Sequence, residues 1–116
     1  MKYQIEAACH CHMGKIRQNN EDNFFFDGKI LPEENAGLKY AISSEFPYNN
    51  EFCVAVFDGM GGEENGQTAS FLAARIFQAM QSDLANYAFH PKMFLRNAVK
   101  KMNDAVCAES QKQGLH

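Results

Sequence analysis

The order of apolar and polar positions changes along this 116-residue chain, and the change predicts strands first and helices afterwards. Residues 3–12 alternate loosely between apolar and polar types, as in a strand with one buried face. Phe24–Phe26 predicts a short second strand. Phe52–Phe57 is a run of apolar, aromatic and β-branched residues bounded by strong breakers, so it predicts a buried strand. Residues 38–42 favour either a strand or part of an irregular excursion that continues to residue 50.

In the second half of the chain, apolar residues recur at spacings of three and four, which predicts two amphipathic helices. The first begins at Asn65 or Gly66. The second begins at Pro91, where the missing N–H costs nothing, and ends near residues 113–114. The predicted core positions are Ala69, Leu72, Ala73, Ile76, Phe77 and Met80 in the first helix, and Leu95, Ala98, Val99, Met102, Ala105 and Val106 in the second.

Strands followed by a helix pair indicate an α+β fold in which both helices cover a sheet. The length suits one domain, residues 1–116, without an internal boundary. Hydrophobic residues make up 46% of the chain, yet no apolar run approaches a membrane span, and the N-terminus carries no secretory signal. A net charge of −3 without a basic stripe argues against nucleic acid as a partner. Four cysteines outside any disulfide-type framework favour reduced thiols and a cytoplasmic protein.

The segment Cys9-His10-Cys11-His12 contains residue types that bind zinc. In a strand, however, the two thiols lie on one face and the two imidazoles on the other, so one ion cannot collect all four. No second Cys/His pair follows at zinc-finger spacing. A plain strand is therefore the favoured interpretation, and a small zinc module is the alternative.

The predicted metal and phosphate chemistry lies at two strand ends. Asp58 ends the run Phe52–Phe57 and is followed by Gly59 and a glycine-rich turn that leads into a helix. A polar loop before Phe24 presents Arg17, Glu21 and Asp22. Carboxylate and carbonyl oxygens of this kind suit Mg²⁺ or Mn²⁺ better than zinc. The arginine is either part of a solvated ion pair or a phosphate clamp beside a metal-binding acid.

These residues occur in two segments that resemble a known family. Residues 14–22, GKIRQNNED, are similar to a G-x-[VI]-R-x-x-N-E-D segment, and residues 56–62, VFDGMGG, followed by Gly66 and Ala69-Ser70, are similar to a DGMGG-x₃-G-x₂-AS segment. Both of these patterns are found in the metal-dependent Ser/Thr protein phosphatases, the PPM or type-2C class, which the chain therefore resembles. The resemblance covers nearly the whole chain, and the Met-Gly-Gly form of the turn is the one usual in bacterial members.

The resemblance implies two packed antiparallel sheets flanked by helix pairs, a PPM-type β-sandwich, with two Mn²⁺ or Mg²⁺ ions at one end. It implies that Asp58 bridges the two metals and that the Gly59 carbonyl reaches one of them. Glu21 and Asp22 would complete the site, mainly through metal-bound water, and Arg17 would grip the substrate phosphate. The implied reaction is hydrolysis of phosphoserine or phosphothreonine in signalling proteins through a metal-bridging hydroxide.

The chain departs from the family in three places. Met60 stands where many eukaryotic members carry a His, and Glu63 where many bacterial members have a His or aromatic residue, so the leaving-group proton is expected to come from water or elsewhere. The remaining metal-ligating aspartates of the family are absent. We therefore expect residues 1–116 to be the N-terminal half of the domain, inactive or weakly active alone. Its exposed apolar surface would then favour self-association or pairing with the C-terminal half. The alternative is a non-catalytic phosphoprotein-binding or scaffold module.

Overall fold

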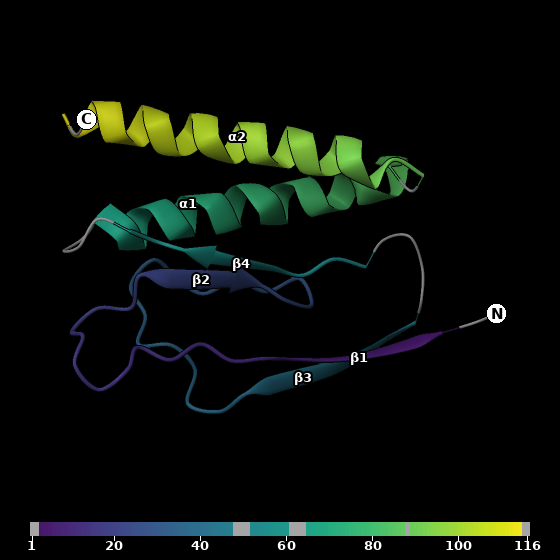
Figure 1. The fold of residues 1–116 in the computed structure, drawn as a ribbon, viewed down its shortest axis with the longest axis horizontal. Coiled ribbons are helices and arrows are strands. Elements are labelled where there is room, and N and C mark those ends of the chain that lie inside the picture. Colours follow the sequence, from purple (N-terminus) through teal and green to yellow (C-terminus); the bar gives the residue numbers. More distant parts are fainter. Residues whose placement is uncertain (1–2, 48–51, 61–64, 88, 115–116) are drawn as a thin grey trace.

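The computed structural model describes residues 3–47, 52–60, 65–87 and 89–114. Four strands precede two long helices, as the sequence pattern predicts (Figure 1). The elements are β1 (Gln4–Cys9), β2 (Asp22–Phe25), β3 (Ile42–Pro47), β4 (Ala55–Asp58), α1 (Asn65–Met80), a 3₁₀ helix (Gln81–Tyr87) and α2 (Pro91–Lys112). The coarse α+β fold class is thereby confirmed.

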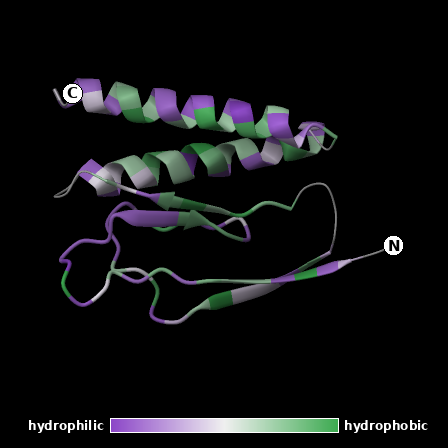
Figure 2. Cartoon of the chain, viewed as in Figure 1, coloured by the Kyte–Doolittle hydropathy of each residue, from purple (hydrophilic) through white to green (hydrophobic). Residues whose placement is uncertain are grey.

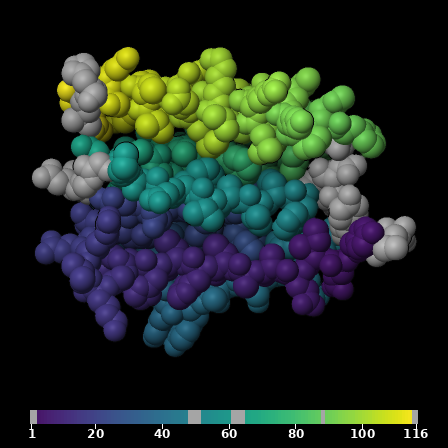
Figure 3. Space-filling view, in the orientation of Figure 1, coloured from purple at the N-terminus to yellow at the C-terminus, as the bar shows by residue number. Residues whose placement is uncertain are grey.

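The strands form two antiparallel pairs, and the elements stack in four layers. β1 pairs with β3, and β2 pairs with β4. In Figure 1 the β1–β3 pair lies below the β2–β4 pair, α1 lies on the other side of β2–β4, and α2 lies outermost on α1. The space-filling view shows the same order of layers, from purple and blue to yellow (Figure 3). The molecule measures 49 × 32 × 16 Å, and its thin dimension fits sheets only two strands wide.

β2 lies at the centre of the core because both of its faces are covered. The ring of Phe25 packs edge-on against Phe77 of α1, with 5.2 Å between centroids. The next residue, Phe26, points the other way and meets Phe46 of β3, with 5.9 Å between centroids. Phe24 shares that second cluster. The phenylalanine run thus joins the helical layer to the β1–β3 layer, which accounts for a strand that is apolar at consecutive positions.

The prediction that Phe52–Phe57 is buried is wrong for one of its faces. Ala55 and Phe57 pack beneath the helices, but Val54 and Val56 are 48% and 81% exposed. The reason is the width of the neighbouring layer, since the apolar residues of β1 and β3 pack against Phe24, Phe26 and Leu31 and do not extend over β4. β4 therefore has one covered and one uncovered face.

The predicted start of α1 at Asn65 and that of α2 at Pro91 are both confirmed, but the predicted core stripe of α2 is partly wrong. Phe94 and Ala98 are the buried residues of α2, whereas Leu95 and Val99 are 53% and 60% exposed. The prediction assumed that both helices cover a sheet. In the structure α2 packs on α1 and the 3₁₀ helix, so only a narrow stripe at four-residue spacing is covered.

The segment that the sequence left open contains β3, which lies later in the chain than the proposed strand at residues 38–42. Its half-buried positions, Ile42, Ser44 and Phe46, alternate with exposed ones, and two of the three buried-side residues are apolar. The alternation is short and has a serine at its central buried-side position, so the sequence pattern alone predicts this strand only weakly. Figure 2 shows hydrophilic positions distributed along α2, and within the described residues no helix is both long and apolar enough to cross a membrane.

Candidate metal and phosphate site

The pairing of β2 with β4 brings two of the predicted ligands together. Asp22 at the start of β2 and Asp58 at the end of β4 are directly opposite each other in the antiparallel register. Directly opposed residues of two such strands extend their side chains on the same face. The pairing continues one residue further, because the Gly59 amide donates to the Glu21 carbonyl over 3.1 Å. The two carboxylates are therefore fixed beside each other by main-chain hydrogen bonds on both sides.

The opposed carboxylates change the acidity of Asp22. Its pKa is raised above the usual aspartate range, first because burial penalises the charged form, and then by hydrogen bonding to Asp58 and by the negative charge of that residue. A hydrogen bond from the Gly59 amide and the positive charge of Arg17 act in the opposite direction. The effects that raise the pKa of Asp22 are larger than those that lower it. Two opposed carboxylates of this kind also attract a metal cation, because a cation neutralises the negative charge of both.

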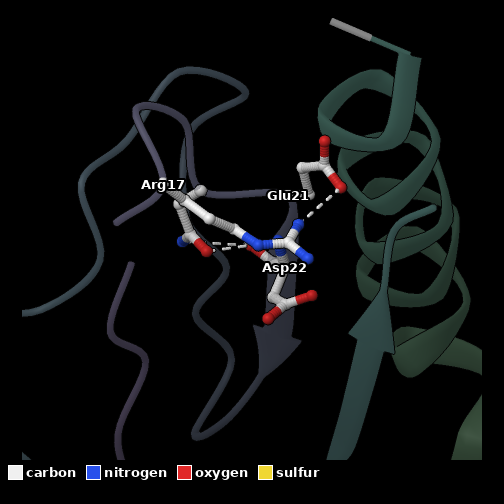
Figure 4. Close-up of polar contacts among 4 residues, drawn as sticks. Arg17, Glu21 and Asp22 are labelled. Atoms are coloured by element: carbon white, nitrogen blue, oxygen red, sulfur yellow. Dashed lines mark hydrogen bonds and ion pairs between the residues drawn. The ribbon is translucent and has the colours of Figure 1, made fainter. Parts of the chain in front are cut away.

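The carboxylate of Glu21 turns away from this pair. In Figure 4 it points toward the start of α1, and the Asp22 carboxylate lies apart from it, on the other side of the Arg17 guanidinium. The Glu21 side chain is only 9% exposed, and its Oε2 atom accepts from Nη1 of Arg17 over 3.3 Å. The same carboxylate abuts Gly66, where an added Cβ would lie 2.9 Å from Oε2. The structure thus joins Asp22 to Asp58, and Glu21 to Arg17.

Arg17 lies on the exposed loop before β2 and, among the described residues, has one long ion pair. Its side chain is 70% exposed, and the 3.3 Å contact with Glu21 is at the weak end of the hydrogen-bonding range. The charge of the guanidinium also acts on Asp22. Arg17 is therefore near both acids, and most of its donors remain available to a ligand that enters from solvent.

Gly59 stands where three backbone segments meet. A Cβ added at this residue would overlap the carbonyl oxygens of Glu21 and Gly66. The position therefore accepts no other residue without moving β4 relative to the start of α1. This close approach aligns the end of β4 with the loop before β2, and so keeps the two aspartates in register.

All five residues singled out from the sequence line one open hollow of about 730 Å³. Arg17, Glu21, Asp22, Asp58 and Gly59 contribute to its wall. Met60 also lines it and is 89% exposed, whereas Glu63 lies outside the described residues. Among the described residues, no group of three or more His, Cys, Asp or Glu side chains is placed to hold a metal ion. The arrangement therefore offers one pair of hard oxygen ligands beside a guanidinium.

Sequence reasoning gave no role to Asn20, which organises the loop between Arg17 and β2. The residue is 3% exposed. Its Nδ2 donates to Oδ1 of Asn35 over 2.6 Å, to the Asp22 carbonyl over 3.3 Å and to Sγ of Cys11 over 3.1 Å, and its Oδ1 accepts from the Asp22 amide over 3.3 Å. The sequence signal for this role was the position of Asn20 between Arg17 and the two acids. An amide side chain there can both donate to and accept from nearby backbone groups, and so hold the loop in place.

β1 ends at Cys9, earlier than the predicted end at residue 12, but the same alternation of faces continues to His12, which pairs with Gly37 in an isolated bridge. The cysteines are half-buried and the histidines exposed, and the two imidazole centroids lie 6.1 Å apart. His10 contacts the Leu38 carbonyl, and Nδ1 of His12 accepts from the Gly14 amide. All four cysteines of the chain are free thiols. Thiols and imidazoles lie on opposite faces here, as the sequence analysis expected.

No family model, curated protein or solved structure matches this chain.

Proposed function

We propose that this chain is the N-terminal portion of a metal-dependent Ser/Thr phosphoprotein phosphatase of the PPM class. The observation that carries the proposal is the opposed pair Asp22 and Asp58, which lines one hollow together with Arg17. The two sequence segments that resemble the family supply exactly these side chains, although they are separated by more than thirty residues in the chain. Convergence of both segments on one hollow supports a shared site rather than two unrelated turns.

The residues present fit a hard divalent cation such as Mn²⁺ or Mg²⁺. Both aspartates offer carboxylate oxygens, and the surrounding wall is polar and open. The pKa of Asp22 is raised by burial and by the neighbouring Asp58, and a bound cation would offset the repulsion between the two carboxylates. Asp58 and Asp22 would hold the ion, with Gly59 contributing its carbonyl. When bound, such ions activate water and neutralise the phosphoryl oxygens of a phosphate ester.

Arg17 is the substrate-binding residue in this proposal. A guanidinium presents its donors in a planar fork that matches two oxygens of a phosphate group. The side chain is already exposed and holds Glu21 through one long contact, so the exchange of that contact for a phosphate costs little. Glu21 would remain near the start of α1, where a negative charge is favourable. The two acids near Arg17 therefore have different roles, since Asp22 would hold the metal ion and Glu21 would position the arginine.

In this proposal, residues 1–116 function together with a second polypeptide segment that covers their exposed apolar surface. Val54 just before β4, Val56 in β4, and Leu95 and Val99 on α2 are apolar and exposed. They support pairing with a C-terminal half or self-association, because β4 has an uncovered face and an apolar surface in water is unfavourable. The free thiols support a cytoplasmic location. We expect little or no turnover from residues 1–116 alone.

One observation favours the second candidate, a non-catalytic phosphoprotein-binding module. Within the part of the chain that the structure describes, no three acidic or imidazole side chains converge as a metal site. A module of this kind would keep Arg17 for phosphate and would not need the cation. The two candidates therefore differ in whether phosphate binding depends on Mn²⁺ or Mg²⁺.

Isothermal titration calorimetry on the intact chain tests the proposal. We expect weak Mn²⁺ binding that Asp58→Ala abolishes, and binding of inorganic phosphate that is stronger with Mn²⁺ present and is lost in Arg17→Ala. Glu6→Gln is the matched control, because it removes one negative charge, as Asp58→Ala does, from an exposed position on β1. This variant should bind as the original chain does. Metal-independent phosphate binding would favour the binding module. Mn²⁺ binding that survives Asp58→Ala would refute the phosphatase proposal.

A further inference from the structure

A second hollow of about 450 Å³ adjoins the one that contains the acid pair, because Met13 and Asn19 line both. Its other lining residues come from three separate parts of the chain. Gln18 belongs to the loop that carries Arg17, residues 34–36 follow β2, and Gln67 lies in the first turn of α1. The two hollows are therefore neighbours, and Gln18 of the second follows Arg17 of the first in the chain.

Most of the wall of the second hollow consists of amide side chains. Asn35 is held in place internally, since it donates to the Pro32 carbonyl over 2.8 Å and accepts from the Gly37 amide over 2.9 Å. The side-chain amides of Gln18 and Gln67 make no hydrogen bond within the described residues. An amide side chain offers both a donor and an acceptor, which is the pattern that a peptide main chain presents in return. The wall therefore suits an extended peptide better than an apolar ligand.

Glu34 gives the second hollow its only charge among the lining residues. The residue is exposed, and neither of the ion pairs among the described residues involves it. The neighbouring hollow contains the positive charge of Arg17 together with the carboxylates of Glu21, Asp22 and Asp58. A ligand that spans both hollows thus meets the Arg17 guanidinium in the first and the Glu34 carboxylate in the second.

We infer that the second hollow is a specificity subsite for the peptide beside the phosphorylated residue, and that Glu34 selects a basic side chain there. The inference rests on the proposed function, because it takes Arg17 as the phosphate-binding residue. Gln18 and Gln67 hydrogen-bond to the main chain of the bound peptide, and Glu34 pairs with an Arg or Lys of that peptide. The substrates are therefore phosphoserine or phosphothreonine segments with a neighbouring basic residue.

NMR titration of the intact chain in Mg²⁺ with short phosphoserine peptides tests this. One peptide carries a single Arg before the phosphoserine, one carries it after, and a third has Ala at both positions. We expect one of the two Arg peptides to bind about threefold more tightly than the Ala peptide, as for an exposed ion pair. The preference should decrease as salt is added. Backbone signals of Gln18, Glu34 and Gln67 should shift with the peptides and not with free O-phosphoserine.

Two variants separate the subsite from the phosphate site. Glu34→Gln should abolish the preference for Arg while the Ala peptide binds unchanged, and Glu6→Gln should retain the preference. Equal binding of all three peptides, or a preference that survives Glu34→Gln, overturns the inference and leaves the phosphate site intact. If none of the peptides binds, or if Arg17→Ala does not weaken binding, the proposed function fails and the inference fails with it.

Discussion

Replacement of Gly59 by alanine tests whether close backbone contact positions the acid pair. A Cβ at this residue would overlap two carbonyl oxygens, those of Glu21 and Gly66. Neither belongs to a flexible side chain, so relief requires β4 to move away from the loop before β2 or from the start of α1. Overpacking of this kind costs about 1 to 3 kcal/mol, and two rigid contacts place Gly59→Ala near 3 kcal/mol. That is a large share of the roughly 5 to 15 kcal/mol by which small domains are stable.

Gly66→Ala is the comparison, because its added Cβ meets a different kind of neighbour. The nearest atoms are the Glu21 carboxylate, at 2.9 and 3.0 Å, and the carbonyl carbon of Gly59 at 3.1 Å. The carboxylate can rotate, and alanine in place of glycine favours a helix by up to about 1 kcal/mol. The two effects oppose each other, so the free energy of unfolding should change by less than about 1 kcal/mol.

Thermal unfolding followed by circular dichroism measures both variants. At about 4 °C per kcal/mol for a chain of this size, Gly59→Ala should lower Tm by about 12 °C and Gly66→Ala by less than about 4 °C. Calorimetry should also show weaker Mn²⁺ binding for Gly59→Ala, since β4 shifts relative to β2. A Gly59→Ala variant that melts within about 4 °C of the original chain refutes the reasoning. Equal losses for both variants would refute it as well.

Four further substitutions have expected outcomes, and two of them form a matched pair on α2. Burial first, and then Asp58, raise the pKa of Asp22, so the metal-free protein loses stability as the pH rises from the unfolded aspartate pKa to this higher value. Asp58→Asn should therefore stabilise the metal-free chain at neutral pH by about 0.2 to 1 kcal/mol after solvent screening, measured by urea unfolding, and no gain would contradict the opposed pair. Asn20→Ala should cost about 1 to 3 kcal/mol, since it leaves part-buried partners without their hydrogen bonds, and an unchanged urea midpoint would contradict a structural role of Asn20. Phe94→Ala should lower the free energy of unfolding by about 3 to 5 kcal/mol, and Leu95→Ala by less than about 0.5 kcal/mol. The reverse order would mean that Leu95 is in the core of α2, as the sequence pattern predicted, and Phe94 is not.

The elements with strong local signals were predictable from the sequence. Pro91 fixes a helix start through its own geometry, and the turn at Asp27-Gly28 has the positive φ values of 51° and 77° that these residue types tolerate. The two-residue turn is closed by paired hydrogen bonds between Phe26 and Lys29. Local chemistry of this kind needs no knowledge of the rest of the fold.

Tertiary neighbours decided the features that the sequence did not predict correctly. The apolar character of Val56 and Leu95 is compatible with burial, but β1 and β3 do not reach over β4, and α2 rests on α1 instead of a sheet. No periodicity contains that information. The position of β3 had the same difficulty, since its pairing with β1 and not its composition defines it.

The candidate site was predictable as a set of residues and not as an arrangement. The acids and Arg17 follow from residue type and from their place at strand ends. That Asp22 faces Asp58 depends on the antiparallel register of β2 and β4, and that Glu21 turns to α1 depends on contact with Gly66. Asn20 was overlooked because its role consists of hydrogen bonds to Asn35 and Cys11, which are distant in the chain.

Paramagnetic broadening of backbone NMR signals by substoichiometric Mn²⁺ tests the central claim most directly, because it locates the ion. The account predicts that the signals of Asp22, Asp58 and Gly59 broaden first in the original chain, and that this selective broadening is lost in Asp58→Asn. Broadening centred on His10 and His12, or spread evenly over exposed carboxylates, would contradict a metal site between β2 and β4.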